Sequence, residues 1–165
     1  LVERALSDTP EHYEAILAAF LDEYALRFDE YSRPYDGILP LLEKLSQEGY
    51  PLGICTNKQQ AYTDKIVAKF YHDTHFVAIA GDRSDGKRKP DPYYPLAIAD
   101  AMKLQPQDIY FVGDSDVDMQ TAKNAGMIAV GVSWGFRSVA ELKAAGADLI
   151  IDHPSDLLKA VKQHG

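Results

Sequence analysis

One stretch, residues 109–118 with the sequence IYFVGDSDVD, constrains the fold of this chain more than any other. It opens with four apolar residues and then Gly113, a pattern typical of a strand that is buried on both faces of a parallel sheet. Asp114, Asp116 and Asp118 follow at alternate positions. Because open α/β sheets bind their ligands at the carboxyl ends of such strands, we expect these acids at a functional edge.

The three carboxylates allow two interpretations. Ligand sets made only of oxygen favour a hard cation, above all Mg²⁺, which predicts a metal site. Alternatively, Asp116 is a helix N-cap and Asp118 is an acid in the first helical turn. Neither capping role explains Asp114, because it precedes the helix and directly follows the buried strand. The sequence therefore favours the metal site while the capping roles stay open.

Strands and helices alternate along most of the chain. We expect strands at 51–56, 76–80, 109–112, 127–132 and 148–151, and helices at 38–48, 58–71, 92–102, 116–125, 138–145 and 155–163. This order requires right-handed crossovers between parallel strands. It predicts an α/β fold, a parallel Rossmann-like sheet with helices on both faces.

The N-terminal part has a different character. Apolar residues spaced by three and four predict an amphipathic helix at 10–28, and residues 1–6 resemble the tail of another helix. The polar segment 29–37 is a candidate hinge or subdomain boundary. Because the chain begins with Leu1 and not Met, we expect a processed, trimmed or partial chain.

Charge and composition exclude several functional classes. The 165 residues carry a net charge of −8, and the only dense basic run is 87–89, so we expect no nucleic-acid partner. No apolar run is long enough to span a membrane, and we expect no membrane partner. The single cysteine, Cys55, excludes an intramolecular disulfide and fits a reducing, cytoplasmic location.

Three chemical features follow three different predicted strands. Thr56 and Asn57, with the N–H groups of the next helix, can hold a phosphate, although Thr56 can also be a simple N-cap. Lys89 in the segment KPDP offers a point charge that suits a phosphate. With the acidic loop 113–118 these features predict a phosphoryl-transfer site, whereas Cys55 is better explained as a buried strand residue than as a nucleophile.

These residues resemble a known family. Thr56 after a strand, Lys89 in KPDP and the segment GDSDVDMQTAKNAG are similar to the last three signatures of the haloacid dehalogenase-like hydrolase superfamily. The likeness continues through GVSWGF at 131–136 and is greatest for the phosphoglycolate phosphatase branch. It implies Mg²⁺-dependent hydrolysis of a small phosphorylated metabolite, similar to phosphoglycolate, through an aspartyl-phosphate.

The resemblance also implies roles for individual residues. Thr56 and Lys89 would be catalytic and bind the transferring phosphate, with Asn57 also in the substrate site. Asp114 would bind Mg²⁺ directly. Asp118 would be a catalytic and metal-site residue that supports the metal's waters or Lys89. Residues 1–35 would be a partial helical cap, and residues 36–165 the α/β core.

One signature of the superfamily is not found. The family begins with a strand that ends in Asp-x-Asp-Gly-Thr and supplies the nucleophile, the general acid/base and two Mg²⁺ contacts. The only Asp-x-Asp patterns in this chain are 114–116 and 116–118, which belong to the last signature. The missing strand would lie between the strands expected at 51–56 and 109–112. Its loss would remove the covalent partner and leave two rows of backbone groups without their usual partners.

Two functions follow from this departure. The chain is part of a phosphatase whose front segment is missing, and is itself inactive, or it is a non-catalytic relic that binds phosphate or a partner. Self-association through the incomplete sheet is compatible with both. A receiver-like domain is disfavoured because its acids precede its Thr and Lys, and a dinucleotide binder because no strand is followed by G-x-G-x-x-G.

Overall fold

The computed structural model describes residues 13–164 and divides the chain into two compact units, Leu1–Pro34 and Tyr35–Gly165. In the first unit, helix α2 (Tyr13–Arg27) has no buried residue. The ring of Tyr24 lies between those of Phe20, in the same helix, and Phe28, just after its end. The predicted helix at 10–28 is confirmed from Tyr13 to Arg27. Residues 10–12 and the helix expected at 1–6 lie outside the described residues.

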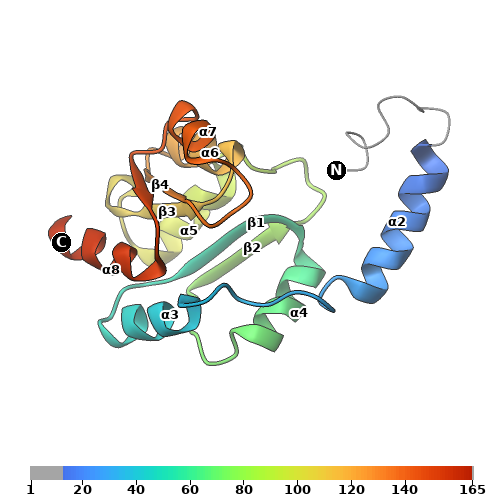
Figure 1. Cartoon of the computed structure of the whole chain (residues 1–165), viewed down its shortest axis with the longest axis horizontal. Coiled ribbons are helices and arrows are strands. Elements are labelled where there is room, and N and C mark those ends of the chain that lie inside the picture. The colour runs from blue at the N-terminus through green and yellow to red at the C-terminus, as the bar shows by residue number, and fades with distance from the viewer. Residues whose placement is uncertain (1–12, 165) are drawn as a thin grey trace. The chain divides into compact units, whose positions relative to one another are not determined.

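The second unit alternates strands and helices, as Figure 1 shows. Its elements are α3 (Ile38–Gln47), β1 (Gly53–Gln59), α4 (Gln60–Phe70), β2 (Ala78–Asp82), α5 (Tyr93–Met102), the 3-10 helix η2 (Pro106–Asp108), β3 (Tyr110–Gly113), α6 (Asp116–Ala125), β4 (Ile128–Val132), α7 (Val139–Ala144), β5 (Leu149–Ile151) and α8 (Pro154–His164). The predicted α/β fold with parallel strands is confirmed. None of the described helices is long and apolar enough to cross a membrane.

The strands form two separate parallel sheets. One contains β1 and β2, and the other contains β3, β4 and β5 in that order. Within the described residues, no strand joins β1 to β3. This is the break that the family resemblance implies, because the first strand of that family would lie between those two elements.

Helices cover both faces of the three-stranded sheet. On one face, Met119 of α6 and Leu142 of α7 are fully buried and pack in one cluster with Ala129 of β4. On the other face, Val130 of β4 packs in a second cluster with Leu157 of α8 and with residues of α3. Ala129 and Val130 lie in opposite clusters because successive side chains of a strand point to opposite faces.

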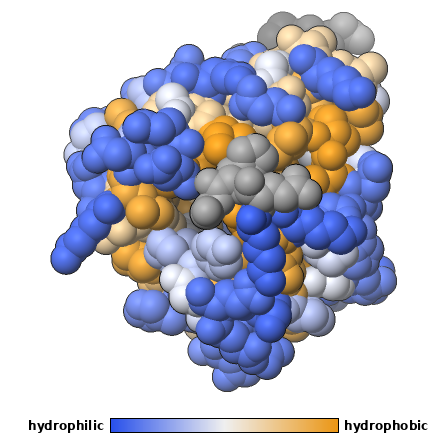
Figure 2. Space-filling view, turned by 90° about the vertical axis from the view of Figure 1, so that its left-hand side faces the viewer, coloured by the Kyte–Doolittle hydropathy of each residue, from blue (hydrophilic) through white to orange (hydrophobic). Residues whose placement is uncertain are grey.

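Some hydrophobic side chains are exposed at the surface of the molecule. Figure 2 shows one face of the molecule, on which hydrophobic surface lies between polar side chains. Val112, in the middle of β3, has 40% of its surface exposed. Such exposure is unusual for a strand whose sequence is that of a buried strand.

Candidate active site

The loop after β3 is organised by a capping box. Ser115 is the N-cap of α6, and its Oγ accepts a hydrogen bond from the backbone N–H of Asp118. The Asp118 carboxylate accepts in return from the backbone N–H of Ser115 at 3.1 Å. The alternative interpretation of Asp116 as the N-cap is therefore wrong. Ser-x-x-Asp at 115–118 is the sequence signal for a capping box.

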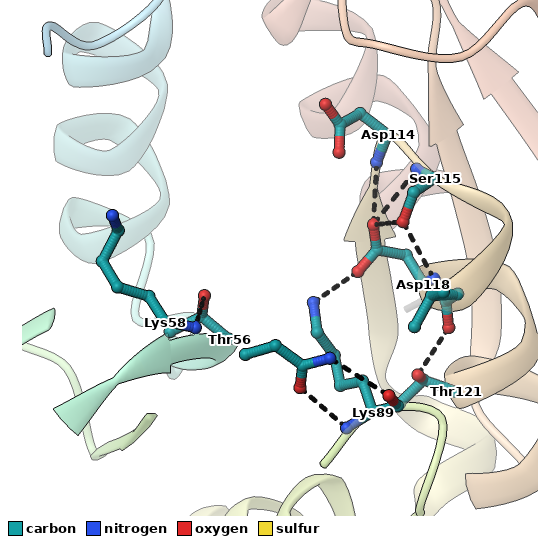
Figure 3. Close-up of polar contacts among 9 residues, drawn as sticks. Thr56, Lys58, Lys89, Asp114, Ser115, Asp118 and Thr121 are labelled. Carbon is teal, nitrogen blue, oxygen red and sulfur yellow. Dashed lines mark hydrogen bonds and ion pairs between the residues drawn. The ribbon is translucent and has the colours of Figure 1, made fainter. Parts of the chain in front are cut away.

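The Asp118 carboxylate lies at the centre of the site, as Figure 3 shows. Its Oδ2 accepts from the backbone N–H of Asp114 at 3.2 Å and from the hydroxyl of Ser115 at 2.6 Å. Its Oδ1 accepts from Lys89 Nζ at 2.6 Å. A side chain at Gly113 would place Cβ 2.2 Å from Cβ of Asp118, so only glycine leaves room for this carboxylate.

Lys89 is held at both its side chain and its main chain. The Lys89 and Asp118 side chains are only 14% and 8% exposed, so their ion pair is largely shielded from water. Asn57 accepts from the Lys89 backbone N–H at 2.8 Å and donates to the Lys89 carbonyl at 3.1 Å. Asn124 donates to the carbonyl of Pro90 at 2.9 Å. These contacts tie the loop that carries Lys89 to β1 and α6.

Asn57 therefore has a positioning role that sequence reasoning missed. Its amide oxygen and nitrogen both bind the backbone of Lys89, 32 residues further along the chain. The contact with substrate that we expect for Asn57 stays a prediction. No local sequence pattern predicts the observed role, because Asn57 binds the backbone N–H and carbonyl of Lys89 in a distant loop.

Thr56 lies within β1, and α4 begins only at Gln60. The helix expected from residue 58 therefore starts later, and its N–H groups do not adjoin Thr56 as we expected. The reason is that β1 continues through an irregular register with β2 between Cys55 and Gln59. The Thr56 hydroxyl accepts from the backbone N–H of Lys58 at 3.2 Å, which leaves its own hydrogen available for a ligand.

Asp114 is placed by the loop after β4. Its Oδ2 accepts from the backbone N–H of Phe136 at 3.1 Å, and its carbonyl accepts from the N–H of Arg137 at 3.2 Å. A Cβ at Gly135 would lie 2.1 Å from that of Asp114, so this close approach needs glycine. The GVSWGF segment thus contributes a backbone cradle, which its composition alone does not reveal.

The described residues offer a partial fit to a metal. None of them form a group of three or more His, Cys, Asp or Glu side chains that could hold an ion. Mg²⁺ is usually held by one or two protein carboxylates together with waters and substrate phosphates. The half-buried Asp114 fits such a role, because its carboxylate accepts from the Phe136 N–H at Oδ2 and, among the described residues, no hydrogen bond engages Oδ1. Asp118 fits less well, because both of its oxygens are engaged.

Cys55 is a free thiol in β1. Burial raises the pKa of Cys55 to about 11, against a weaker opposing effect of the Lys89 charge. Because the thiolate is the reactive form, this cysteine should react slowly at neutral pH. The environment agrees with the interpretation of Cys55 as a strand residue.

Known proteins are similar to this chain in sequence and in fold. The family model described as haloacid dehalogenase-like hydrolase matches residues 4–132. A phosphoglycolate phosphatase of Mesorhizobium japonicum is 36% identical over 132 residues, which are 78% of this chain and 56% of that protein. An N-acetylmuramic acid 6-phosphate phosphatase of Pseudomonas aeruginosa is 32% identical over 153 residues, 92% of this chain and 67% of that protein.

Solved structures agree with this placement. The structure of a predicted phosphoglycolate phosphatase from Haemophilus somnus superimposes with a TM-score of 0.81 at 30% identity, covering 92% of this chain and 68% of that one. The chain therefore spans between about half and two thirds of the length of these relatives. By sequence and by fold, the chain belongs to the haloacid dehalogenase-like hydrolase family.

Proposed function

We propose that this chain carries the phosphate-binding and metal-binding part of a phosphatase that hydrolyses a small phosphomonoester. The observation that carries the proposal is the position of Lys89, whose ammonium group pairs with Asp118 after β3 while Asn57 of β1 holds its backbone. A lysine fixed at the carboxyl ends of two strands offers a point charge where α/β sheets bind their ligands. Phosphoryl transfer depends chiefly on such positioning and charge stabilisation.

Each side chain has a distinct part in the proposed reaction. Thr56 donates its hydroxyl hydrogen to a phosphate oxygen, and Lys89 stabilises the charge of the transferring phosphoryl group. Asp118 acts through Lys89 and is a positioning residue. Asp114 would hold Mg²⁺, which supplies further charge stabilisation to the phosphoryl oxygens when bound.

The proposed nucleophile is the aspartate of an Asp-x-Asp strand in the parent protein, which residues 1–165 do not contain. Its carboxylate oxygen bonds to phosphorus as the bond from phosphorus to the ester oxygen breaks, and the general acid of the same Asp-x-Asp segment gives its proton to the leaving alcohol. That group then takes a proton from the water in the second step. Water then attacks the aspartyl-phosphate, which releases inorganic phosphate and restores the carboxylate. Since residues 114–118 are already committed to the loop, we propose that residues 1–165 release no phosphate by themselves.

The substrate class rests on the names of the relatives. They are phosphatases of phosphoglycolate and of N-acetylmuramic acid 6-phosphate, and both compounds are phosphomonoesters. We infer a small phosphorylated metabolite of the phosphoglycolate type as the substrate of the parent protein. A cytoplasmic location belongs to the same proposal, because the cysteine is a free thiol.

The test begins with the intact mass and N-terminal sequence of the native protein. That form and residues 1–165 are then assayed for release of phosphate from 2-phosphoglycolate with and without Mg²⁺. We expect a native chain that extends through an Asp-x-Asp strand to be active and residues 1–165 to be inactive. Turnover by residues 1–165 would contradict the proposed inactivity, and an extended native chain without turnover would contradict the phosphatase.

One observation favours a second function. No nucleophile pattern is found in residues 1–165 outside the last signature. The second proposed function is therefore to bind phosphate or a partner without chemistry. This alternative predicts a native protein that starts near Leu1 and binds inorganic phosphate in calorimetry without turnover. A native protein that lacks both binding and turnover would contradict both functions.

A further inference from the structure

The loop between β2 and α5 (Figure 1) carries the only dense basic run of the sequence and brings Lys89 to the candidate site. Two cations of this run have carboxylate partners. Lys89 Nζ pairs with Asp118 at 2.6 Å, and Arg88 Nε lies 3.2 Å from a carboxylate oxygen of Asp82. The third cation, Lys87, differs from them, because its Nζ forms no ion pair with any residue that the structure describes and lies over an aromatic ring instead.

The ring of Tyr93 holds the Lys87 side chain in place. Lys87 Nζ lies 3.4 Å from the centre of this ring, well inside the distance of about 6 Å at which cation–π attraction acts. The ring attracts the cation without neutralising it, because the ring itself has no net charge. Since an ammonium group has several N–H donors, Lys87 keeps both its charge and the capacity to donate to an anion beside the ring.

The backbone of Lys87 is fixed as well. Its N–H donates to Asp85 Oδ1 at 3.1 Å, and Asp85 Oδ2 accepts from the hydroxyl of Tyr94 at 2.6 Å. The hydrogen bond from Tyr94, followed by the one from the Lys87 backbone, lowers the pKa of Asp85, and the charge of Lys87 is the smallest contribution. Because Tyr93 and Tyr94 begin α5, the first turn of one helix holds Lys87 at both its side chain and its main chain.

Lys87 begins close to the proposed phosphate site. Two residues of chain span at most about 7 Å, so the Cα atoms of Lys87 and Lys89 lie within that distance of each other. Asn57, which follows Thr56 in β1, binds both backbone groups of Lys89. A small phosphomonoester whose phosphate is held by Thr56 and Lys89 therefore has its other end within reach of the Lys87 side chain.

We propose that Lys87 is a specificity-determining residue, which binds the carboxylate of a substrate that is a phosphorylated hydroxy acid. The inference rests on the proposed phosphatase function and assigns one residue to the recognition of its substrate class. A carboxylate brought to this edge of the sheet would otherwise meet only repulsion from the acids of the loop 113–118. A cation without a carboxylate partner favours substrates that carry a second negative charge over those that do not.

The experiment is calorimetry of the full 165-residue chain with Mg²⁺ and two ligands, 2-phosphoglycolate and ethyl phosphate. Ethyl phosphate has a methyl group where 2-phosphoglycolate has its carboxylate. We expect 2-phosphoglycolate to bind at least about tenfold more tightly, and Lys87→Met to reduce the ratio of the two affinities to within about twofold. The ratio cancels any change in phosphate binding that both ligands share. Lys159→Met is the matched control, because it removes the same charge from an exposed position in α8 and should leave the ratio unchanged.

A second variant tests how the lysine is held. Tyr93→Leu should reduce the ratio less than Lys87→Met does, and it should have no further effect when Lys87 is already replaced, because the ring acts through the lysine. Equal affinity of the unchanged chain for both ligands would overturn the inference and leave the phosphate site intact. An unchanged ratio in Lys87→Met, an equal loss in Lys159→Met, or an independent effect of Tyr93→Leu would overturn it as well. Failure of both ligands to bind would contradict the proposed phosphate site itself, and the inference with it.

Discussion

Replacement of Asp118 by asparagine should strongly destabilise the fold. The carboxylate accepts from Lys89 Nζ through one oxygen and from the loop of Asp114 and Ser115 through the other. An amide keeps only one acceptor oxygen. If that oxygen serves the loop, the amide NH₂ group faces the ammonium group of Lys89, and two donors oppose each other with no acceptor.

The magnitude follows from burial. Lys89 and Asp118 are 14% and 8% exposed, and removal of one partner from a buried pair costs about 3–5 kcal/mol in the free energy of unfolding. The chain offers a matched control in Asp156, whose Oδ1 also lies 2.6 Å from a lysine, Lys159, and which also stands in the first turn of a helix. Lys159 and Asp156 are 71% and 34% exposed, so Asp156→Asn should cost far less than Asp118→Asn.

Urea unfolding, followed by circular dichroism, measures both variants. With a slope of about 2 kcal/mol per molar, Asp118→Asn should lower the midpoint by about 1.5–2.5 M, and Asp156→Asn by less than about 0.5 M. The double variant with Lys89→Met should lose less stability than the sum of the two single changes, because it leaves no uncompensated charge. If Asp118→Asn costs no more than Asp156→Asn, burial does not set the strength of this pair and the reasoning fails.

Two further substitutions and one titration test other parts of the site. Gly135→Ala adds a Cβ 2.1 Å from that of Asp114 and should lower the free energy of unfolding by about 1–3 kcal/mol, as measured with urea. An unchanged midpoint would show that the loop can move to accept the Cβ without a loss of stability. Asn57→Ala removes two hydrogen bonds to Lys89 and should cost about 1–3 kcal/mol, whereas a loss below about 0.5 kcal/mol would deny it the positioning role. Alkylation of Cys55 should increase with pH towards a midpoint near 11, and a midpoint near 9 would mean that the thiol is solvated.

The order of elements could be predicted from the sequence because hydrophobic patterning is local. The run at 109–112 and the alternating acids after it place a strand, a turn and a helix, and the structure has them as β3 and α6. The convergence of Lys89 on the acidic loop also follows, since both come after strands of one parallel fold. The break between β1 and β3 was expected for another reason, because the family resemblance implies a strand between them that this sequence does not show.

The start of α4 and the part played by Asn57 could not be predicted in this way. The sequence after Thr56 has a helical pattern, but pairing with β2 keeps residues 57–59 in β1, and such tertiary contacts override local preference. Asn57 binds backbone atoms of Lys89, and such a contact cannot be predicted from the pattern of side chains. The glycines at 113 and 135 are similar, because they matter through the space that a distant aspartate fills.

The charges of the site bear on how it could hold a phosphate. Lys89 is paired with Asp118 and Arg137 lies 3.6 Å from Asp116, so the charges of these two cations are offset by carboxylates of the acidic loop. Asp114 adds a further negative charge, and a phosphate brought to this edge would meet net repulsion. We therefore expect calorimetry to detect binding of inorganic phosphate with Mg²⁺ and at least about tenfold weaker binding in its absence. Equal affinity in a chelating buffer would mean that Lys89 and Thr56 suffice, and that the acids do not serve a metal.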